Sequence, residues 1–145
     1  MTKTTLSALA SAVILTLATS GAAFAETAVD KATAHFNAIA SADVDAAMAG
    51  YAEDAVFQWV GGPLDGVYSG ADAIRGAWTK FTGAQGEIGV DVADVQTAAN
   101  PKGTTVSANV VFHGKKAIPV RYVLVYRDGA LVSEIWQIAA MKTGY

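Results

Sequence analysis

The chain has 145 residues, a formal net charge of −3 and no cysteine. This length allows one domain with a substantial hydrophobic core, and the lack of cysteine excludes disulfides and thiolate metal ligands. The acidic balance, with no basic cluster beyond Lys115-Lys116, argues against nucleic acid as a partner.

The first 25 residues have the pattern of a secretory leader. Lys3 provides a short positive start, Leu6–Ala18 is an apolar run, and Ala23-Phe24-Ala25 matches a small-x-small cleavage site. A membrane anchor is the alternative, but the apolar run is short for a bilayer, so we expect no stable membrane insertion. We predict cleavage before Glu26, one domain over residues 26–145, and a periplasmic or secreted location.

Three helices are predicted in the first part of that domain. Apolar residues recur at helical spacing over Thr27–Ala40. Asp43 is a plausible N-cap of a short second helix that carries Val44, Ala47, Met48 and Tyr51. A third helix should follow Ser69 or Gly70, because its apolar residues again have helical spacing: Ile74, Ala77, Trp78 and Phe81.

The remaining segments read as strands. Apolar and polar residues alternate, β-branched residues are frequent, and turn signals such as Asp128-Gly129 separate the runs. The predicted strands are Asp54–Val60, Val67-Tyr68, Ile88–Thr97, Thr104–His113, Ile118–Arg127 and Ala130–Ala140. Helices followed by a strongly bent antiparallel sheet indicate an α+β fold.

The stretch Tyr51–Phe81 resembles a known signature region. The segments YAEDAVF and YSGADAIRGAW, joined by a glycine-rich turn, are similar to the nuclear transport factor 2-like superfamily, which includes SnoaL-like polyketide cyclases, ketosteroid isomerases and limonene epoxide hydrolases. The resemblance spans roughly residues 28–140. It implies a cone-shaped α+β barrel in which a curved antiparallel sheet surrounds three helices and a pocket.

The resemblance also implies a homodimer that forms through the outer face of the sheet. The residues assigned to that face are apolar enough to favour coverage by a partner. They are Val123, Val125, Leu131 and Ile135.

Three polar residues are candidates for catalysis. Alternation along the last two strands places Tyr122, Glu134 and Trp136 on one face, which we expect to be the interior. An interior Glu134 would need a partner or a raised pKa, which makes it a candidate acid or base; the alternative is a solvated or interfacial carboxylate on the outer face. His35 lies beside the apolar face of the first helix and is either a ligand-facing group or a half-buried packing residue.

The sequence departs from the enzymes that it resembles. At the position of the ketosteroid isomerases' catalytic aspartate the chain has Trp59, and at their second hydrogen-bond donor it has Tyr122, while His35 falls where they place a tyrosine. These differences argue against isomerase chemistry by that route. Arg121 has the wrong strand parity for an epoxide hydrolase triad.

No metal or cofactor site is predicted. The two histidines, His35 and His113, are far apart in sequence, and no phosphate-binding loop is present. We expect His113 to be exposed and without a role, and Asp54 to have a structural role at the start of its strand.

Three functions remain open. The first is an exported protein that binds a small, largely apolar molecule between aromatic walls. The second is an enzyme of the same fold with His35, Glu134 and Tyr122 as catalytic candidates, and the third is an interaction domain with a filled cone. Glu134 within hydrogen-bond reach of His35 or Tyr122 would favour the enzyme, and an open pocket without that pair would favour binding. A packed cone would favour the structural or interaction domain. The predicted ligand-binding residues are Phe57, Trp59, Trp78, Tyr122 and Trp136.

Overall fold

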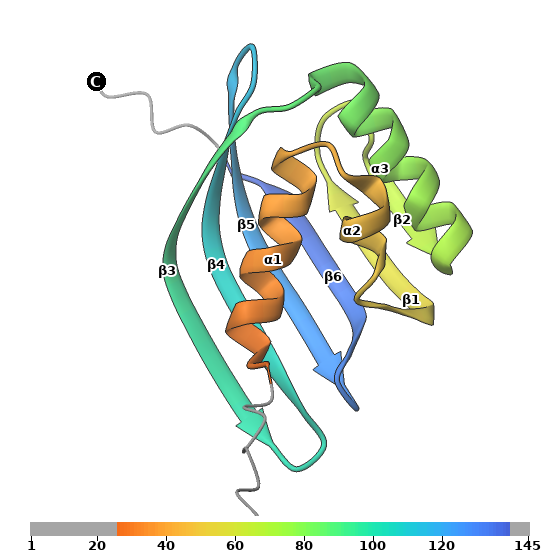
Figure 1. The fold of residues 1–145 in the computed structure, drawn as a ribbon, viewed down its shortest axis with the longest axis vertical. Coiled ribbons are helices and arrows are strands. Elements are labelled where there is room, and N and C mark those ends of the chain that lie inside the picture. Colours follow the sequence, from red (N-terminus) through yellow and green to blue (C-terminus); the bar gives the residue numbers. More distant parts are fainter. Residues whose placement is uncertain (1–25, 140–145) are drawn as a thin grey trace, which may run out of the picture.

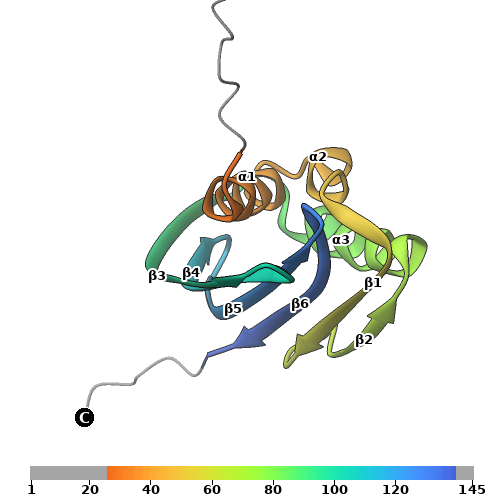
Figure 2. The ribbon, with the colours of Figure 1, turned by 90° about the horizontal axis from the view of Figure 1, so that it is seen from below.

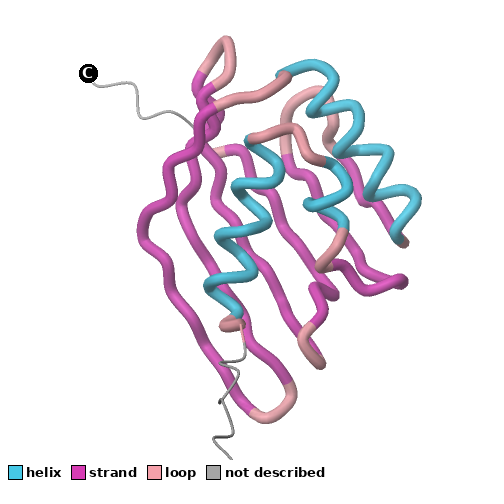
Figure 3. The backbone as a smooth tube through the Cα atoms, viewed as in Figure 1, coloured by secondary structure: helices cyan, strands magenta, loops and turns pink. Residues whose placement is uncertain are grey.

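The computed structural model describes residues 26–139, so the leader predicted over residues 1–25 lies outside the described part. Three helices lie on the concave side of one curved six-stranded sheet (Figures 1 and 2). Helices α1 and α2 precede the first two strands, α3 follows these strands, and the last four strands come after α3 without a further helix (Figure 3). The elements are α1 (Ala28–Ala40), α2 (Val44–Met48), β1 (Tyr51–Val60), β2 (Gly66–Ser69), α3 (Ala71–Gln85), β3 (Gly89–Asn100), β4 (Gly103–His113), β5 (Ala117–Arg127) and β6 (Ala130–Ile138).

The α+β architecture expected from the sequence is confirmed, with one difference in the sheet. Its strand order is β2-β1-β6-β5-β4-β3, so β2 and β3 are the two edges of an unclosed sheet. The neighbouring strands pair antiparallel except β1 and β6, which pair in parallel and bring Phe57 opposite Glu134. This parallel pair follows from the long connection between the two strands, since a parallel pair needs a crossover and not a hairpin.

Helix α1 begins at a capping box. The Thr27 hydroxyl accepts a hydrogen bond from the Asp30 backbone N–H at 3.1 Å, and the Asp30 carboxylate accepts one from the Thr27 backbone N–H at 3.1 Å. These bonds satisfy N–H groups that have no partner within a helix. They fix where α1 starts, and so which of its residues face the sheet: Ala32, His35, Phe36 and Ile39 are buried.

Helix α2 is shorter than the sequence suggested. Asp43 is its N-cap, as expected, and accepts from the Ala46 backbone N–H at 2.9 Å. The helix ends at Met48, however, and Tyr51 is the first residue of β1. The helical spacing of Tyr51 was therefore misleading. Gly50 is the sequence feature that indicates the end of the helix before Tyr51, because glycine is unfavourable within helices.

A bulge in β6 overturns one face assignment. Tyr126 pairs with Leu131, but Val125 pairs with Ser133, so β6 has one extra residue between these pairs. Because a bulge shifts side-chain parity, Leu131 and Glu134 both point inward although they are three residues apart. The prediction that Leu131 lies on the outer face is wrong, since its exposed fraction is 1%.

Aromatic side chains from α3 and the sheet fill the space between the layers. Trp78 of α3 stacks on Phe57 of β1, with ring centroids 5.0 Å apart. Trp136 stacks on Trp59 at 4.5 Å and on Phe112 at 5.0 Å. Packing of this kind makes these rings the core of the domain.

No helix within residues 26–139 is both long enough and apolar enough to cross a membrane.

Candidate functional site

A buried histidine–glutamate pair lies where α1 crosses the sheet. His35 on α1 and Glu134 on β6 are 7% and 0% exposed, and the His35 Nε2 atom lies 3.0 Å from Glu134 Oε1. The expectation that Glu134 faces the interior is confirmed. Helical periodicity turns His35 toward the sheet, and alternation along β6 turns Glu134 toward the same interior.

A backbone carbonyl group determines that the Nδ1 atom of His35 carries a proton. The Nδ1 atom of His35 lies 3.2 Å from the carbonyl oxygen of Ala47, which can only accept a hydrogen bond, so Nδ1 carries a proton. Nε2 and Oε1 then share one further proton. Either His35 is an imidazolium beside a carboxylate, or it is neutral and accepts from a protonated Glu134. Both forms are neutral overall, which suits burial.

Tyr51 completes the cluster. Its hydroxyl donates to Glu134 Oε2 and accepts a hydrogen bond from the Trp78 indole at 2.9 Å. Each carboxylate oxygen of Glu134 therefore has its own partner. Burial, and then the charge and hydrogen bond of Glu134, raise the pKa of Tyr51 well above its usual value, so the phenol is protonated and remains a donor.

Tyr122 lies next to this cluster but does not join its hydrogen bonds. Its side chain is fully buried, and its ring centroid lies 4.7 Å from that of Phe36. Its hydroxyl has no hydrogen-bond partner within residues 26–139. Burial first, and the nearby charge of Glu134 second, raise the pKa of Tyr122 well above its usual value. An unpartnered buried hydroxyl is a stability cost of about 1–3 kcal/mol.

We therefore expect Tyr122→Phe to leave the free energy of unfolding unchanged, or to raise it by about 1 kcal/mol. The raised pKa of Tyr122 also makes stability depend on pH. Above about pH 10 the tyrosine ionises in the unfolded protein but not in the folded one, so the free energy of unfolding falls as the pH rises further. The variant should thus lose stability less steeply than the parent between about pH 10 and 12. Urea unfolding at several pH values measures both effects; a loss of about 1 kcal/mol or more at pH 7 would show that the hydroxyl bonds Glu134.

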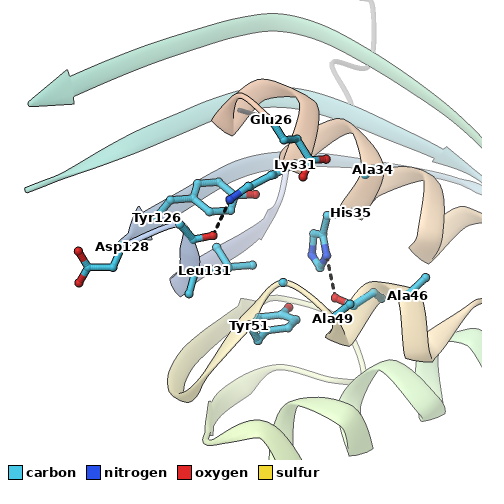
Figure 4. Close-up of a pocket in the computed structure, with 14 residues that line it drawn as sticks. Glu26, Lys31, Ala34, His35, Ala46, Ala49, Tyr51, Tyr126, Asp128 and Leu131 are labelled. Carbon is cyan, nitrogen blue, oxygen red and sulfur yellow. Dashed lines mark hydrogen bonds between the residues drawn. The ribbon is translucent and has the colours of Figure 1, made fainter. Parts of the chain in front are cut away.

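A pocket of about 450 Å³ opens beside the cluster (Figure 4). It lies between α1, the end of α2, the start of β1 and the turn that joins β5 to β6. His35 and Tyr51 form its inner wall, and Glu134 lies behind them. The other lining residues are mostly small or apolar: Ala34, Ala46, Ala47, Ala49, Gly50, Tyr126, Gly129, Ala130 and Leu131, with Glu26, Lys31 and Asp128 as the charged ones.

The predicted aromatic wall lies elsewhere. Phe57, Trp59, Trp78, Tyr122 and Trp136 are between 0% and 4% exposed and belong to the packed core, and none of them lines this pocket. Of the predicted site residues, His35 lines the pocket and Glu134 contacts a lining residue. Whether the aromatic residues bind a ligand remains a prediction.

Residues for which the sequence predicted no role in the site contact other polar side chains away from the pocket. His113 is exposed, and its Nε2 atom lies 2.8 Å from Asp91. Arg121 bonds Asn109 at 3.2 Å and Ser107 at 3.3 Å, away from the pocket. In residues 26–139 no group of three or more histidine, aspartate or glutamate side chains is arranged to hold a metal ion.

Sequence reasoning missed four lining residues that contribute to the site. Tyr51 was assigned to a helix and Leu131 to the outer face, for the reasons given above. Lys31 and Tyr126 do have a signal in the sequence, which is their spacing from the predicted residues. Lys31 precedes His35 by one helical turn, and Tyr126 shares the interior parity of Tyr122, so both face the same side as the predicted residues.

The family comparisons agree with this fold. A protein-family model described as a SnoaL-like domain matches residues 32–133. A search of curated protein sequences found no significant match.

Several solved structures are similar to the chain. An NTF2-like protein of unknown function from Pseudomonas putida KT2440 has 17% identity and a TM-score of 0.67, covering 79% of this chain and 86% of that one. A protein with a ketosteroid isomerase-like fold from Catenulispora acidiphila DSM 44928, in complex with trimethylamine, has 19% identity and a TM-score of 0.59, covering 78% and 88%. A ketosteroid isomerase-like protein from Erwinia carotovora atroseptica SCRI1043 has 17% identity and a TM-score of 0.57, covering 77% and 92%. At these identities the similarity concerns the fold.

Proposed function

The chain belongs to the SnoaL-like domain family, and we propose that it binds a small, largely apolar molecule in the pocket between α1, α2 and the β5–β6 turn. The observation that carries this proposal is the pocket itself. Its volume of about 450 Å³ is within the range of small-molecule sites, and small apolar side chains dominate its wall. A neighbour in the fold was solved with trimethylamine, which supports a small ligand.

The hydrogen bonds of the buried cluster at the inner wall are already formed within the protein. Both ring nitrogens of His35 and both oxygens of Glu134 already have partners. A ligand would therefore meet a wall whose hydrogen bonds are satisfied, and its binding would rest on the apolar surface and on the groups at the rim.

Acid–base catalysis is the second candidate, and one observation favours it. The His35–Glu134 pair at 3.0 Å is the arrangement that we expected of an enzyme when only the sequence was considered. The shared proton can move between Nε2 and Oε1 without a net charge in the interior. For turnover, Tyr51 or His35 would have to exchange one present hydrogen bond for one to the substrate.

A titration with N-phenyl-1-naphthylamine, a neutral fluorescent probe, tests the binding proposal. We expect saturable binding with one site per chain in the parent protein. Ala34→Trp should abolish it, because Ala34 lines the pocket and the indole would fill the opening. Thr33→Trp is the matched control, since it adds the same ring at an exposed position of the same helix that does not line the pocket. No saturable binding to the parent, or equal effects of both variants, would contradict the proposal.

The proposal includes export and dimerisation, both as expectations. Removal of residues 1–25 would leave Glu26, a residue at the rim of the pocket, as the first residue. An intact mass of the exported protein that begins at Glu26 supports this, and an uncleaved chain in the membrane fraction contradicts it.

The outer face of the sheet is the expected dimer interface. Val123, Val125 and Ile135 are only partly buried there. We expect sedimentation of the protein at micromolar concentration to give a dimer, and Ile135→Lys to shift it toward monomer because a buried charge in an apolar interface is costly. Val67→Lys, at a position 66% exposed on the edge strand β2, is the control and should leave the dimer intact. A monomeric parent protein would contradict this interface.

A further inference from the structure

Lys31 places a positive charge on the wall of the pocket. Its side chain reaches from α1 across to the β5–β6 turn, where Nζ donates to the carbonyl oxygen of Gly129 at 2.7 Å (Figure 4). An ammonium group has three N–H donors, so two remain for another acceptor. Within residues 26–139, Lys31 forms no ion pair with a carboxylate.

Tyr126 is a second donor on the same wall. It is 5% exposed and lines the same pocket, and its hydroxyl makes no hydrogen bond to residues 26–139. Burial, together with the charges of Glu134 and Glu26, raises its pKa, so the phenol keeps its proton at neutral pH. This hydroxyl is accessible to solvent and is therefore free to donate a hydrogen bond to a ligand in the pocket.

The acidic groups near the opening are placed differently. Asp128 is exposed, and Figure 4 shows its carboxylate turned away from the pocket. Glu26 is exposed at the rim. At the inner wall, the His35–Glu134 pair is neutral in either protonation form. Lys31 is the one lysine or arginine among the described lining residues, and its Nζ is held at the β5–β6 turn.

We propose that the ligand carries an anionic oxygen group, such as a carboxylate, which accepts hydrogen bonds from Lys31 Nζ and the Tyr126 hydroxyl. Its apolar part then lies against Ala47, Ala49 and Leu131, below the anionic end. This inference rests on the proposed binding function and adds the class of ligand: a small amphipathic acid. A hydrogen bond to a charged group contributes roughly ten- to a hundredfold in affinity, enough to select an acid over a neutral molecule of equal size.

Three competitors with the same ten-carbon chain isolate the head group. Decanoate, 1-decanol and decylammonium are each used to displace N-phenyl-1-naphthylamine from the parent protein at pH 7.5. We expect decanoate to displace the probe at a concentration roughly ten- to a hundredfold lower than decanol does. Lys31→Gln should bring that ratio close to one, and Tyr126→Phe should lower it several-fold.

Two controls separate charge from folding. Lys31→Arg keeps the positive charge and should keep the preference for decanoate, and Lys102→Gln, an exposed lysine that does not line the pocket, should change nothing. Equal displacement by decanoate and decanol, or tighter binding of decylammonium, would overturn the anionic head group while leaving the pocket's binding function intact. Failure of the probe itself to bind would instead overturn the proposed function on which this inference rests.

Discussion

Trp136→Ala is expected to lower the free energy of unfolding by about 3–5 kcal/mol, the usual cost of removing a buried tryptophan ring. The Trp136 ring is fully buried and stacks on Trp59 at 4.5 Å and on Phe112 at 5.0 Å. Alanine would leave a cavity that these rings cannot close without giving up their own contacts. Urea unfolding followed by fluorescence measures the loss.

The same position distinguishes a core residue from a ligand wall. Trp136→Phe keeps most of the ring and should cost less than Trp136→Ala, while Val67→Ala, at a position 66% exposed, should change stability by no more than about 0.5 kcal/mol. Folded Trp136→Phe should still bind the naphthylamine probe with parental affinity. Lost probe binding at unchanged stability would contradict this and would return Trp136 to the ligand site that the sequence predicted.

Replacing Glu134 gives the second large effect, and its size depends on the replacement. In Glu134→Ala the Tyr51 hydroxyl and the His35 Nε2 atom both lose their partner inside the protein. Breaking a buried pair in this way costs about 3–5 kcal/mol. Glu134→Gln should cost about 1 kcal/mol or less, because its amide N–H can donate to His35 Nε2 and its amide oxygen can accept from Tyr51.

Glu134→Gln also separates the two candidate functions. The amide keeps the shape of the side chain but holds no exchangeable acid proton. If the protein only binds a ligand, affinity should stay within about tenfold of the parent, the scale of one hydrogen bond. If Glu134 takes part in proton transfer, turnover of a substrate should fall by about a hundredfold or more while binding survives. A Gln variant as unstable as the Ala variant would contradict the proton assignment at His35.

Much of the fold followed from simple periodicities. Alternation along β5 and most of β6 placed Tyr122, Glu134 and Trp136 inside, and helical spacing turned Phe36 and Ile39 toward the sheet. These patterns predict well because each buried face must be apolar for the whole length of its element.

The errors lie where the period changes. The bulge in β6 reverses parity at Leu131, and nothing in the local sequence marks an extra residue within this strand. Tyr51 has the right spacing for a helix that has already ended, and only Gly50 before it indicated the break. Both residues line the pocket, so these two local errors account for two of the four lining residues that were missed.

The position of the pocket could not be predicted from residue types. Large aromatic side chains serve equally well as a ligand wall and as a core, because both need apolar surface. Aromatic residues form a core when the rings of facing elements pack against one another, and a ligand wall when a space remains between them. Trp78 of α3 is stacked on Phe57, and this closes the space that the sequence left open. The pocket opens instead beside residues with small side chains, such as Ala34 and Gly50. Small residues form no sequence pattern from which a pocket could be predicted.

A ligand is expected to occupy the pocket at α1, α2 and the β5–β6 turn, and not the aromatic interior. Nuclear magnetic resonance of the ¹⁵N-labelled protein of residues 26–145 tests this during titration with decanoate. We expect saturable shifts that are largest at the backbone amides of Ala34, Gly50 and Leu131, with the indole N–H signals of Trp59 and Trp136 nearly unmoved. Largest shifts at those two indole signals, or no saturable shift at the three amides, would contradict binding in this pocket.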